Sequence, residues 1–413
     1  MSEYFISLTV GNNITELPKS TLPASAGDGA GHYPFFCSSP EVKATTTWLQ
    51  EKSAVLMGTG GVASVNYGED KFAYSTDTWG FRSNNINLGT KFLFRKVQQH
   101  LPRIDYAGFE GSGLRHLRKY YVKKLKINVP SPDIQTRIVA ILHGCDFAIE
   151  NTEALIAKYQ QIKAGLMHDL FTRGVTVYGK LRTPREQAPK LYHESPIGWI
   201  PKEWEVKALP QVAAYQHGRP FPSTDYSDEG ALLLRPGNLH VSGIVNFDAA
   251  HTTRIPNRWL RECPDLVLKQ QDIVMNLTAQ SLEDQFLGRV CIVRETEPAL
   301  LNQRIARFFP RQVEHHFLYW LLKSVQFRKQ IDRTSQGTKV QHLYNSDLNR
   351  VLFAVPSSSQ GQGHIAALLL SVTESLLAEE LSVKQLHQQK SGLMHDLLTG
   401  KVRVKIHGQE NTI

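Results

Sequence analysis

Two eight-residue segments of this sequence are nearly identical, and this internal repeat constrains the fold more than any other feature. Residues 165–172 read Gly-Leu-Met-His-Asp-Leu-Phe-Thr, and residues 392–399 read Gly-Leu-Met-His-Asp-Leu-Leu-Thr. Repeats have to be identified first, because a duplicated unit dictates the architecture of the whole chain. The offset of 227 residues in a chain of 413 predicts two copies of one structural unit.

The repeat continues upstream of these segments. His116-Leu117 precedes Val129-Pro130 by the same spacing that separates His342-Leu343 from Val355-Pro356. The residue before a proline is kept out of the helical conformation, and the serine after each proline can cap a following helix. Each half therefore consists of a globular region, a Val-Pro step and a long helix, with helix starts predicted near residues 132 and 360.

Both predicted helices carry a seam of residues spaced alternately by four and three. Eight of the ten seam positions are apolar in each helix, and the two polar exceptions fall at equivalent positions. Such sustained spacing is typical of a coiled coil. The seam of the first helix comprises positions 138, 142, 145, 149, 152, 156, 159, 163, 166 and 170, and that of the second comprises the same positions plus 227.

The length of these helices requires a packing partner. About forty residues make a helix ~60 Å long, more than one small domain needs to cover its core. The simplest partner for each helix is the other one. An antiparallel pair, with the globular domains at opposite ends and a pseudo-twofold axis, fits the chain order, because the sequence supplies no long return connection for a parallel pair. On periodicity alone, a dimerisation coil in an unrelated protein is the alternative.

The regions outside the helices contain short strand-like runs separated by glycine, asparagine and aspartate turns. We predict a hairpin over Leu56–Val65, strands over Asp272–Leu277 and Gly288–Val293, and a helix over Phe317–Ile331. The fold class is α+β, with two strand-rich domains and two long antiparallel coiled-coil helices. The predicted divisions are a first domain (1–130), a first helix (131–174), a linker (175–198), a second domain (199–356), a second helix (357–401) and a tail (402–413).

Part of the repeated segment lies off the seam, where helix packing does not require identity. The repeat is then explained either by a recent duplication or by two copies of one partner that bind both sites, and we favour the partner. The predicted partner-binding residues are Met167, His168, Asp169, Met394, His395 and Asp396.

Positive charge is concentrated in the globular regions of this chain, whose net charge is +9. Two basic stretches, residues 111–132 and 302–342, interleave cations with aromatic and polar side chains, a mixture suited to phosphates and base edges. A solvated surface is the alternative, but the His-Leu pair in both stretches favours DNA contact. The predicted DNA-binding residues are Arg115, His116, Lys119, Lys123, Lys124, Arg304, Arg307, Lys339, Gln341 and His342.

The sequence carries no motif that points to catalysis. Gly58-Thr59-Gly60-Gly61 lacks the lysine of a phosphate-binding loop, and Glu314-His315-His316 lacks metalloprotease spacing. The four cysteines form no Cys-x-x-Cys pair, which argues against a zinc site or a disulfide framework and for core residues. No secretory signal or membrane span is evident, so we expect a cytoplasmic protein.

These features together resemble the specificity subunit of type I restriction-modification systems. The resemblance covers nearly the whole chain and rests on the two helices, the Val-Pro steps, the repeated segment and the linker that follows the first helix. In the linker, the specific matches are Thr172–Val175, Gly179–Arg182, Pro184–Glu186 and Ser195–Trp204.

The resemblance implies a non-catalytic subunit with two target-recognition domains, each reading one half of a bipartite site in double-stranded DNA. It also implies that the helices set the gap between the half-sites. Two methyltransferase subunits and motor-nuclease subunits would be the partners. S-adenosylmethionine, Mg and ATP would be bound by those subunits and not by this chain.

The sequence departs from the family pattern in two places. The segment Trp199–Trp204 has no counterpart before the first domain, which predicts a diverged or truncated start before about residue 30. The helix starts Asp133-Ile134-Gln135 and Ser359-Gln360-Gly361 lack the usual glutamate-glutamine pair. The competing readings are a self-sufficient DNA modification or restriction enzyme and a coiled-coil scaffold without sequence specificity.

Overall fold

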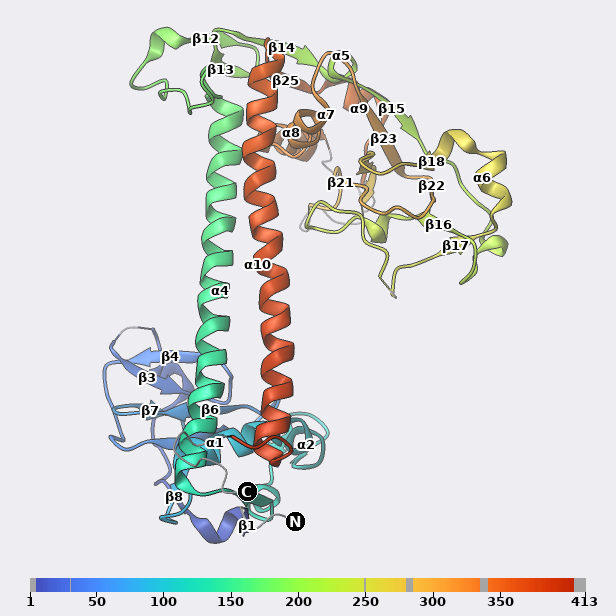
Figure 1. Cartoon of the computed structure of the whole chain (residues 1–413). Coiled ribbons are helices and arrows are strands. Elements are labelled where there is room, and N and C mark those ends of the chain that lie inside the picture. Colours follow the sequence, from blue (N-terminus) through green and yellow to red (C-terminus); the bar gives the residue numbers. More distant parts are fainter. Residues whose placement is uncertain (1–4, 30, 249, 280–284, 335–340, 405–413) are drawn as a thin grey trace, which may run out of the picture. The chain divides into compact units, whose positions relative to one another are not determined.

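The computed structural model describes residues 5–29, 31–248, 250–279, 285–334 and 341–404. Two helices of 41 residues each, α4 (Pro132–Thr172) and α10 (Ser359–Thr399), begin where the sequence predicts (Figure 1). The chain forms two compact units, each of which contains one strand-rich domain and part of both helices. Residues 1–155 with 379–413 make up the first unit, and residues 156–378 make up the second.

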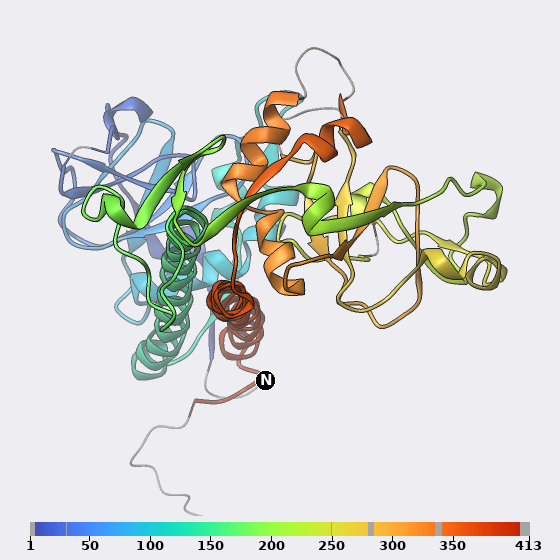
Figure 2. The same ribbon diagram turned by 90° about the horizontal axis from the view of Figure 1, so that it is seen from above.

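The long helices run antiparallel, as predicted (Figure 1), and the view from above also shows them side by side (Figure 2). In the first unit, Lys390 of α10 pairs with Asp146 of α4 at 2.6 Å, and His387 lies 3.7 Å from Glu153 further along α4. All twenty seam positions are buried or half-buried, whereas most positions between them are exposed. The alternating spacing therefore marks the packing interface, and the predicted coiled-coil pair is confirmed.

The first domain is built around a four-stranded sheet in the order β2-β8-β5-β6, with α1 packed against it. A separate pair joins β1 to β11, and a three-stranded sheet has the order β4-β3-β7. The strands are β1 (Ile6–Thr9), β2 (Ile14–Glu16), β3 (Tyr33–Phe36), β4 (Val42–Thr45), β5 (Ala54–Gly58), β6 (Val65–Gly68), β7 (Ala73–Tyr74), β8 (Thr78–Ser83), β9 (Phe109–Glu110), β10 (His116–Leu117) and β11 (Lys126–Val129). The helices are α1 (Thr90–Gln99), α2 (Leu101–Ala107) and α3 (Lys119–Lys123).

The second domain repeats this plan with a sheet in the order β15-β23-β19-β21 and a pair that joins β14 to β25. A second four-stranded sheet, β17-β16-β22-β18, takes the place of the three-stranded one. The strands are β12 (Tyr192–Ser195), β13 (Gly198–Pro201), β14 (Trp204–Ala208), β15 (Ala213–His217), β16 (Ala231–Leu234), β17 (Arg254–Ile255), β18 (Val267–Leu268), β19 (Ile273–Asn276), β20 (Thr278–Ala279), β21 (Val290–Ile292), β22 (Ala299–Leu301), β23 (Ile305–Pro310), β24 (Gln341–His342) and β25 (Leu352–Pro356). The helices are α5 (Leu209–Val212), α6 (Arg258–Glu262), α7 (His315–Leu321), α8 (Val325–Thr334) and α9 (Asn345–Arg350).

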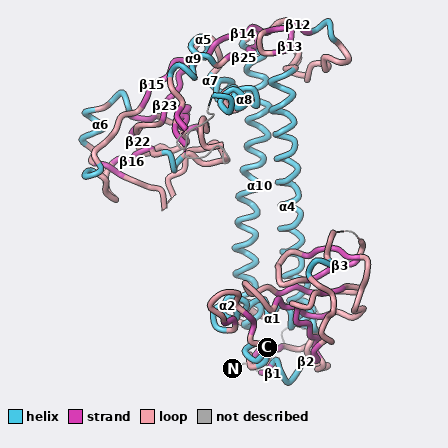
Figure 3. The backbone as a smooth tube through the Cα atoms, turned by 180° about the vertical axis from the view of Figure 1, so that it is seen from behind, coloured by secondary structure: helices cyan, strands magenta, loops and turns pink. Residues whose placement is uncertain are grey.

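Both domains consist mainly of strands and loops, which confirms the α+β prediction (Figure 3). The expected hairpin over Leu56–Val65 is the antiparallel pair β5 and β6, and the two strands predicted in the second domain are β19 and β21. The helix predicted over Phe317–Ile331 is instead two helices, α7 and α8. Ser324 separates them, because its buried hydroxyl accepts a hydrogen bond from the Phe327 amide at 3.2 Å and caps α8.

The described residues of the first domain from 5 onward form regular elements, with a strand at the place where the second domain has β14. β1 pairs with β11 just as β14 pairs with β25. Before β1, the Phe5 ring covers Gly400 at the end of α10, and in the second unit the Trp204 ring covers Gly174 at the end of α4. Both glycines have positive φ, and an added Cβ would meet the aromatic ring at 2.7 or 2.5 Å.

The core of each domain is completed by side chains from both long helices. In the first unit, Ile138 and Leu142 of α4 and Leu397 and Leu398 of α10 join one buried cluster. In the second unit, the equivalent cluster contains Leu170 and Phe171 of α4 together with Ile365 and Leu369 of α10. Of the four free cysteines, three are buried and Cys145 is half-buried. Within the described ranges, no helix combines the length and the apolar character needed to cross a bilayer.

An ion triad connects the first domain to both helices. Asp146 of α4 accepts from Lys390 of α10 and from Arg95 of α1. Burial alone would raise the pKa of Asp146, but the hydrogen bonds from Lys390 and Arg95 outweigh it and hold that pKa below its ordinary value. Because the folded pKa is depressed, the triad stabilises the fold above the unfolded pKa of the carboxyl and loses this effect as the pH falls through the folded pKa.

We predict that Asp146→Asn lowers the free energy of unfolding by about 2 kcal/mol near neutral pH, because it leaves the buried Arg95 and the half-buried Lys390 without their counter-charge. Unfolding by denaturant should show this loss at pH 7 and a smaller difference from the wild type near pH 3. The exposed Glu150→Gln on the same helix is the control. A difference between Asp146→Asn and wild type that stays constant with pH would contradict the role given to the triad.

Candidate nucleic-acid interface

Part of the basic stretch of the first domain is paired with acids from elsewhere in the fold. Arg115 pairs with Asp105 at 2.9 Å, and both Lys119 and Lys123 pair with Glu16. The hydrogen bond from Lys123 is the main reason that the pKa of Glu16 is lowered. Three of the predicted DNA-binding cations are thus engaged within the domain.

The second domain shows what these lysines do for the fold. Glu16 at the end of β2 braces α3 through Lys119 and Lys123. At the corresponding place, β15 braces α9, where Tyr215 Oη donates to Asn349 Oδ1 at 2.9 Å and His217 Nε2 lies 2.7 Å from Asn345 Oδ1. Ion pairs in one domain and side-chain hydrogen bonds in the other therefore hold a short helix to the edge strand of the sheet, β2 or β15.

The paired histidines occupy equivalent places in the two domains. His116 in β10 bridges to Gly60, two residues beyond β5, and His342 in β24 pairs with Thr278, two residues beyond β19. His342 Nδ1 lies 3.1 Å from Thr278 Oγ1. Both histidines are exposed, and the leucine that follows each packs against the core of its domain. The repeated His-Leu pair therefore combines an inward anchor with an outward polar group.

The remaining predicted cations differ in their availability. Lys124 is exposed, with its ammonium 4.3 Å from the centre of the Tyr120 ring. Arg307 is 7% exposed, and its guanidinium is engaged by Asp272, Gln216 and backbone carbonyls, so it holds the domain together and presents no charge at the surface. Gln341 lies in β24 next to His342. Lys339 lies outside the described residues.

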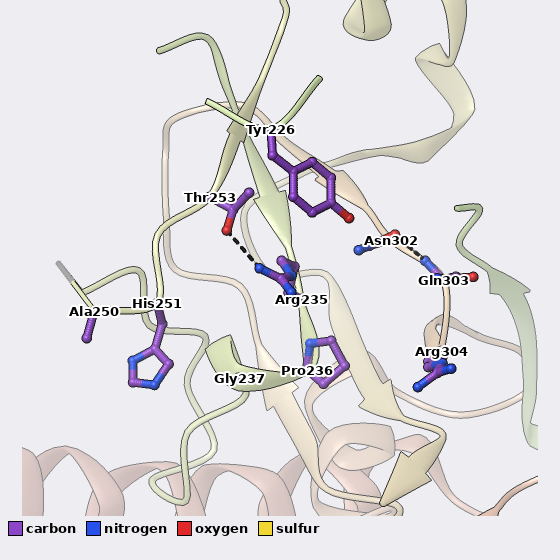
Figure 4. A pocket seen from close by; sticks show the side chains of 10 residues that line it. All are labelled: Tyr226, Arg235, Pro236, Gly237, Ala250, His251, Thr253, Asn302, Gln303 and Arg304. Atoms are coloured by element: carbon purple, nitrogen blue, oxygen red, sulfur yellow. Dashed lines mark hydrogen bonds between the residues drawn. The ribbon is translucent and has the colours of Figure 1, made fainter. Parts of the chain in front are cut away.

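Arg304 lines a cleft of about 500 Å³ in the second domain (Figure 4). Arg235 joins it there, its guanidinium 5.3 Å from the centre of the Tyr226 ring and 3.1 Å from Thr253 Oγ1. The other lining residues are Pro236, Gly237, Ala250, His251, Asn302 and Gln303. Two guanidiniums, an imidazole, a phenol and amides around one open cleft can bind an anion and the polar edges of a base.

The backbone around Arg304 is held in an unusual conformation. Arg304 has a φ of +69°, a region that non-glycine residues rarely adopt. Its carbonyl accepts from the Leu277 amide at 2.8 Å, which secures the strained turn. Gly218 lies against the same turn, where a Cβ would approach the Asn302 carbonyl oxygen to 2.0 Å. Such strain is held in place by the surrounding structure and directs the Arg304 side chain toward the cleft.

A smaller hollow of about 210 Å³ in the second domain brings Arg289, Lys323 and Arg328 together. Burial lowers the pKa of Lys323 to about 8. Gly243, with a φ of +86°, leaves room for the Lys323 ammonium, since a Cβ there would lie 2.1 Å from Nζ. Arg289 directly precedes β21 and Lys323 lies between α7 and α8, so their proximity is a property of the fold.

The predicted partner-binding residues lie at the ends of the long helices. In the second unit, His168 and Asp169 line a hollow of about 410 Å³. The linker forms its other wall, where the Arg185 guanidinium stacks 5.1 Å from the centre of the Trp199 ring. In the first unit, Asp396 lies 3.7 Å from Lys401, and His395 is exposed. Met167 and Met394 are half-buried against the domain cores, so each methionine serves packing as well as any partner.

Sequence reasoning missed a pair of buried glutamines, Gln135 and Gln362. They are related by the same offset of 227 and connect each long helix to its domain. The repeat signal could have identified them, since a polar residue conserved between two copies inside a helix start is unusual. Among the described residues, no three histidine, cysteine or acidic side chains gather closely enough to hold a metal ion.

Comparison with known protein families supports the resemblance seen in the sequence. Residues 17–161 match the family described as the type I restriction modification DNA specificity domain. The chain is 29% identical over 299 residues to the type I restriction enzyme MjaVIII specificity subunit of Methanocaldococcus jannaschii, covering 72% of this chain and 66% of that protein. A putative MjaX specificity subunit of the same organism is 25% identical, with 69% and 61% covered. The matches span just under two thirds of these relatives.

Solved structures share the fold. The type I restriction-modification S subunit from M. genitalium superposes with a TM-score of 0.67 at 16% identity, over 96% of this chain and 97% of that one. A structure of a type I restriction-modification system, described in terms of complex assembly and conformational transition, gives a TM-score of 0.50 at 14% identity, over 97% and 99%. The α+β architecture with two long helices is thus that of type I specificity subunits.

The bracing role of Lys123 leads to a matched pair of variants. We predict that Lys123→Ala lowers the free energy of unfolding by up to about 1 kcal/mol, because Glu16 loses its nearest cation, whereas Lys124→Ala, which loses only a contact with the exposed Tyr120 ring, lowers it by less. Thermal unfolding of the two variants at low salt measures the difference. Equal effects of both substitutions would show that Lys123 is only a surface charge.

Proposed function

We propose that this chain, which carries a type I restriction modification DNA specificity domain and resembles type I specificity subunits over most of its length, is the DNA-reading subunit of a type I restriction-modification complex. The observation that carries the proposal is the structural duplication: two domains with the same sheet order stand in one chain, each built on both long helices. Two similar readers in one chain suit a DNA site made of two separated halves.

Each domain would contact one half-site through its exposed polar surface. In the second domain, the cleft with Arg235 and Arg304 offers guanidiniums that can bind guanine edges or phosphates in bidentate fashion. In the first domain, the exposed His116 bridges to Gly60 and the exposed Lys124 follows α3, so both side chains are accessible to a duplex. Arg307 is excluded from this role because its guanidinium is buried.

The paired helices would set the gap between the half-sites. A 41-residue helix is ~60 Å long, and one turn of DNA is ~34 Å, so a stiff spacer fixes both the distance and the groove that each reader faces. The continuous burial of the seam supports stiffness, because bending would expose apolar side chains.

The repeated segment would dock two copies of one partner, the methyltransferase subunit. Two identical Met-His-Asp triplets at the helix ends fit two identical partners. In this proposal the partners, with motor-nuclease subunits, bind S-adenosylmethionine, Mg and ATP and perform the chemistry, while this chain supplies sequence recognition alone. The alternative functions are a self-sufficient modification or restriction enzyme and a scaffold without sequence preference.

The test of the proposal is to map methylated adenines in cells that carry the partner methyltransferase with and without this chain. We expect modification at one bipartite sequence only when the chain is present. The purified complex should bind that duplex with an affinity that falls steeply with salt. Methyl transfer by the chain alone would establish the enzyme reading, and equal binding to all sequences would establish the scaffold reading.

Shortening the helices should shorten the gap. We predict that deleting residues 152–158 and 379–385, one heptad from the middle of each helix, brings the half-sites closer by ~10 Å, or about three base pairs. Both half-site sequences should stay the same, because neither domain is altered. Adenine methylation mapping reads the gap directly, and an unchanged gap would refute the spacer role of the helices.

Removing the charge of Arg304 should weaken reading of one half-site. We predict that Arg304→Asn, which tolerates the positive φ, costs roughly 1 to 3 kcal/mol of specific binding free energy at that half-site and nothing at the other. Arg261→Asn, an exposed arginine on α6, is the matched control. Equal losses at both half-sites, or no loss at either, would rule out the cleft as a reader.

A further inference from the structure

A buried glutamine connects the start of each long helix to the domain that precedes that helix in the chain. In the first unit, Gln135 Oε1 accepts from the Gly89 amide at 2.9 Å, and its Nε2 donates to the carbonyls of Pro130 and Asn87, both at 2.7 Å. Gly89 is the residue that caps α1. The side chain is 3% exposed and therefore joins α4 to α1 without access to water.

The second unit contains the same connection. Gln362 Oε1 accepts from the Glu314 amide at 2.8 Å, and Nε2 donates to the Pro356 carbonyl at 2.9 Å. Glu314 caps α7, the counterpart of α1. Gln362 is also 3% exposed. Two glutamines at equivalent positions thus both accept from the amide of a helix-capping residue and donate to a proline carbonyl.

A second connection in each unit holds the end of the other long helix, which is α10 in the first unit and α4 in the second. The last carbonyls of a helix have no partner within it. In the first unit, Lys96 of α1 donates to the Leu398 carbonyl at the end of α10. In the second unit, Gln326 of α8 donates at 2.6 Å to the Phe171 carbonyl at the end of α4. Phe171 and Leu398 are equivalent in the repeat, so the two domains satisfy the same carbonyl with different side chains.

We infer that Gln135, Lys96, Gln362 and Gln326 are positioning residues that fix the orientation of each domain on the paired helices. A single attachment would act as a hinge. Two attachments, to two helices that run in opposite directions, remove that freedom. All partners within one clamp lie in the same compact unit. We define the clamp of each unit as its glutamine at the helix start together with its donor at the helix end.

The clamps have a consequence for gap selectivity, which rests on the proposed function. A stiff pair of helices selects one gap length only if each recognition domain is held in a fixed orientation on the helices. If a domain could rotate on its helices, neighbouring gap lengths would become acceptable without any change in the bases read. The clamp residues would therefore determine gap selectivity although they touch no DNA.

The orientation can be measured without DNA by pulsed electron spin resonance within the second unit. Spin labels at Lys158 of α4 and Arg261 of α6, both exposed, report the distance between helix and domain. The half-buried Cys145 is first replaced by alanine, since the other three cysteines are buried. We expect a narrow distance distribution in this background and a clearly broader one in Gln326→Leu with Gln362→Leu. The exposed Gln360→Leu, two residues before Gln362, is the control.

An unchanged distribution in the double variant, with helix content retained, overturns the inference. If the double variant does not fold, Gln326→Leu is compared with Gln326→Lys, which restores a donor as Lys96 does in the first unit. Broadening in the leucine variant that the lysine variant reverses supports the clamp. Equal distributions in both variants overturn it.

The effect on gap selectivity is tested with the complete complex and duplexes whose half-sites are separated by different gaps. We expect the wild type to prefer one gap and the clamp variant to bind the adjacent gaps several-fold better relative to that optimum, with unchanged half-site preference. A wild type without gap preference would refute the proposed function. A wild type with a preference that the clamp variant retains would refute the inference alone.

Discussion

The antiparallel packing of α4 against α10 is the interaction on which the rest of the structure depends. Each domain core is finished by side chains from both helices, so the end of α10 contributes Leu397 and Leu398 to the core of a domain that begins the chain. The second core likewise takes Leu170 and Phe171 from α4 and Ile365 from α10. Because of this exchange, neither half of the chain contains all of the residues that its own domain buries. Each half of the chain therefore needs the long helix of the other half to exclude water from its domain core.

The two units solve the same structural problems with different chemistry. The short helix beside the sheet is held by the Glu16 ion pairs in one domain and by Tyr215 and His217 in the other. A carbonyl at the end of a long helix accepts a hydrogen bond from Lys96 in the first unit and from Gln326 in the second. By contrast, a glutamine lies at the start of the long helix in both units, Gln135 in α4 and Gln362 in α10. The short helix, the helix start and the terminal carbonyl are thus held in both units, and the side chains that hold them differ in two of these three cases.

Local patterns in the sequence were sufficient for the helices and the general class of the domains. The four-three spacing depends only on residues a turn or two apart, so it identified all twenty seam positions and, with the chain order, the antiparallel direction. The alternation and turn residues around Leu56–Val65 likewise identified a hairpin. The helix expected over Phe317–Ile331 failed for a local reason as well, since the Ser324 hydroxyl offers the backbone an alternative bond that periodicity does not reveal.

The candidate site could be predicted from the sequence only in part. The sequence alone established the repeat, the paired helices, the strand-rich domains and the basic character of the stretch that contains Lys119 and Lys123. Only the tertiary structure decided which cations are paired within the domain, because Glu16 and Asp105, which pair with three of them, lie outside that stretch in the chain. It also placed Arg235 beside Arg304 and closed the clamps from residues as far apart as Lys96 and Leu398. Electrostatic pairing and hydrogen bonding act over a few ångströms in space, and the periodicity of a sequence carries no information about which distant segments come within that range.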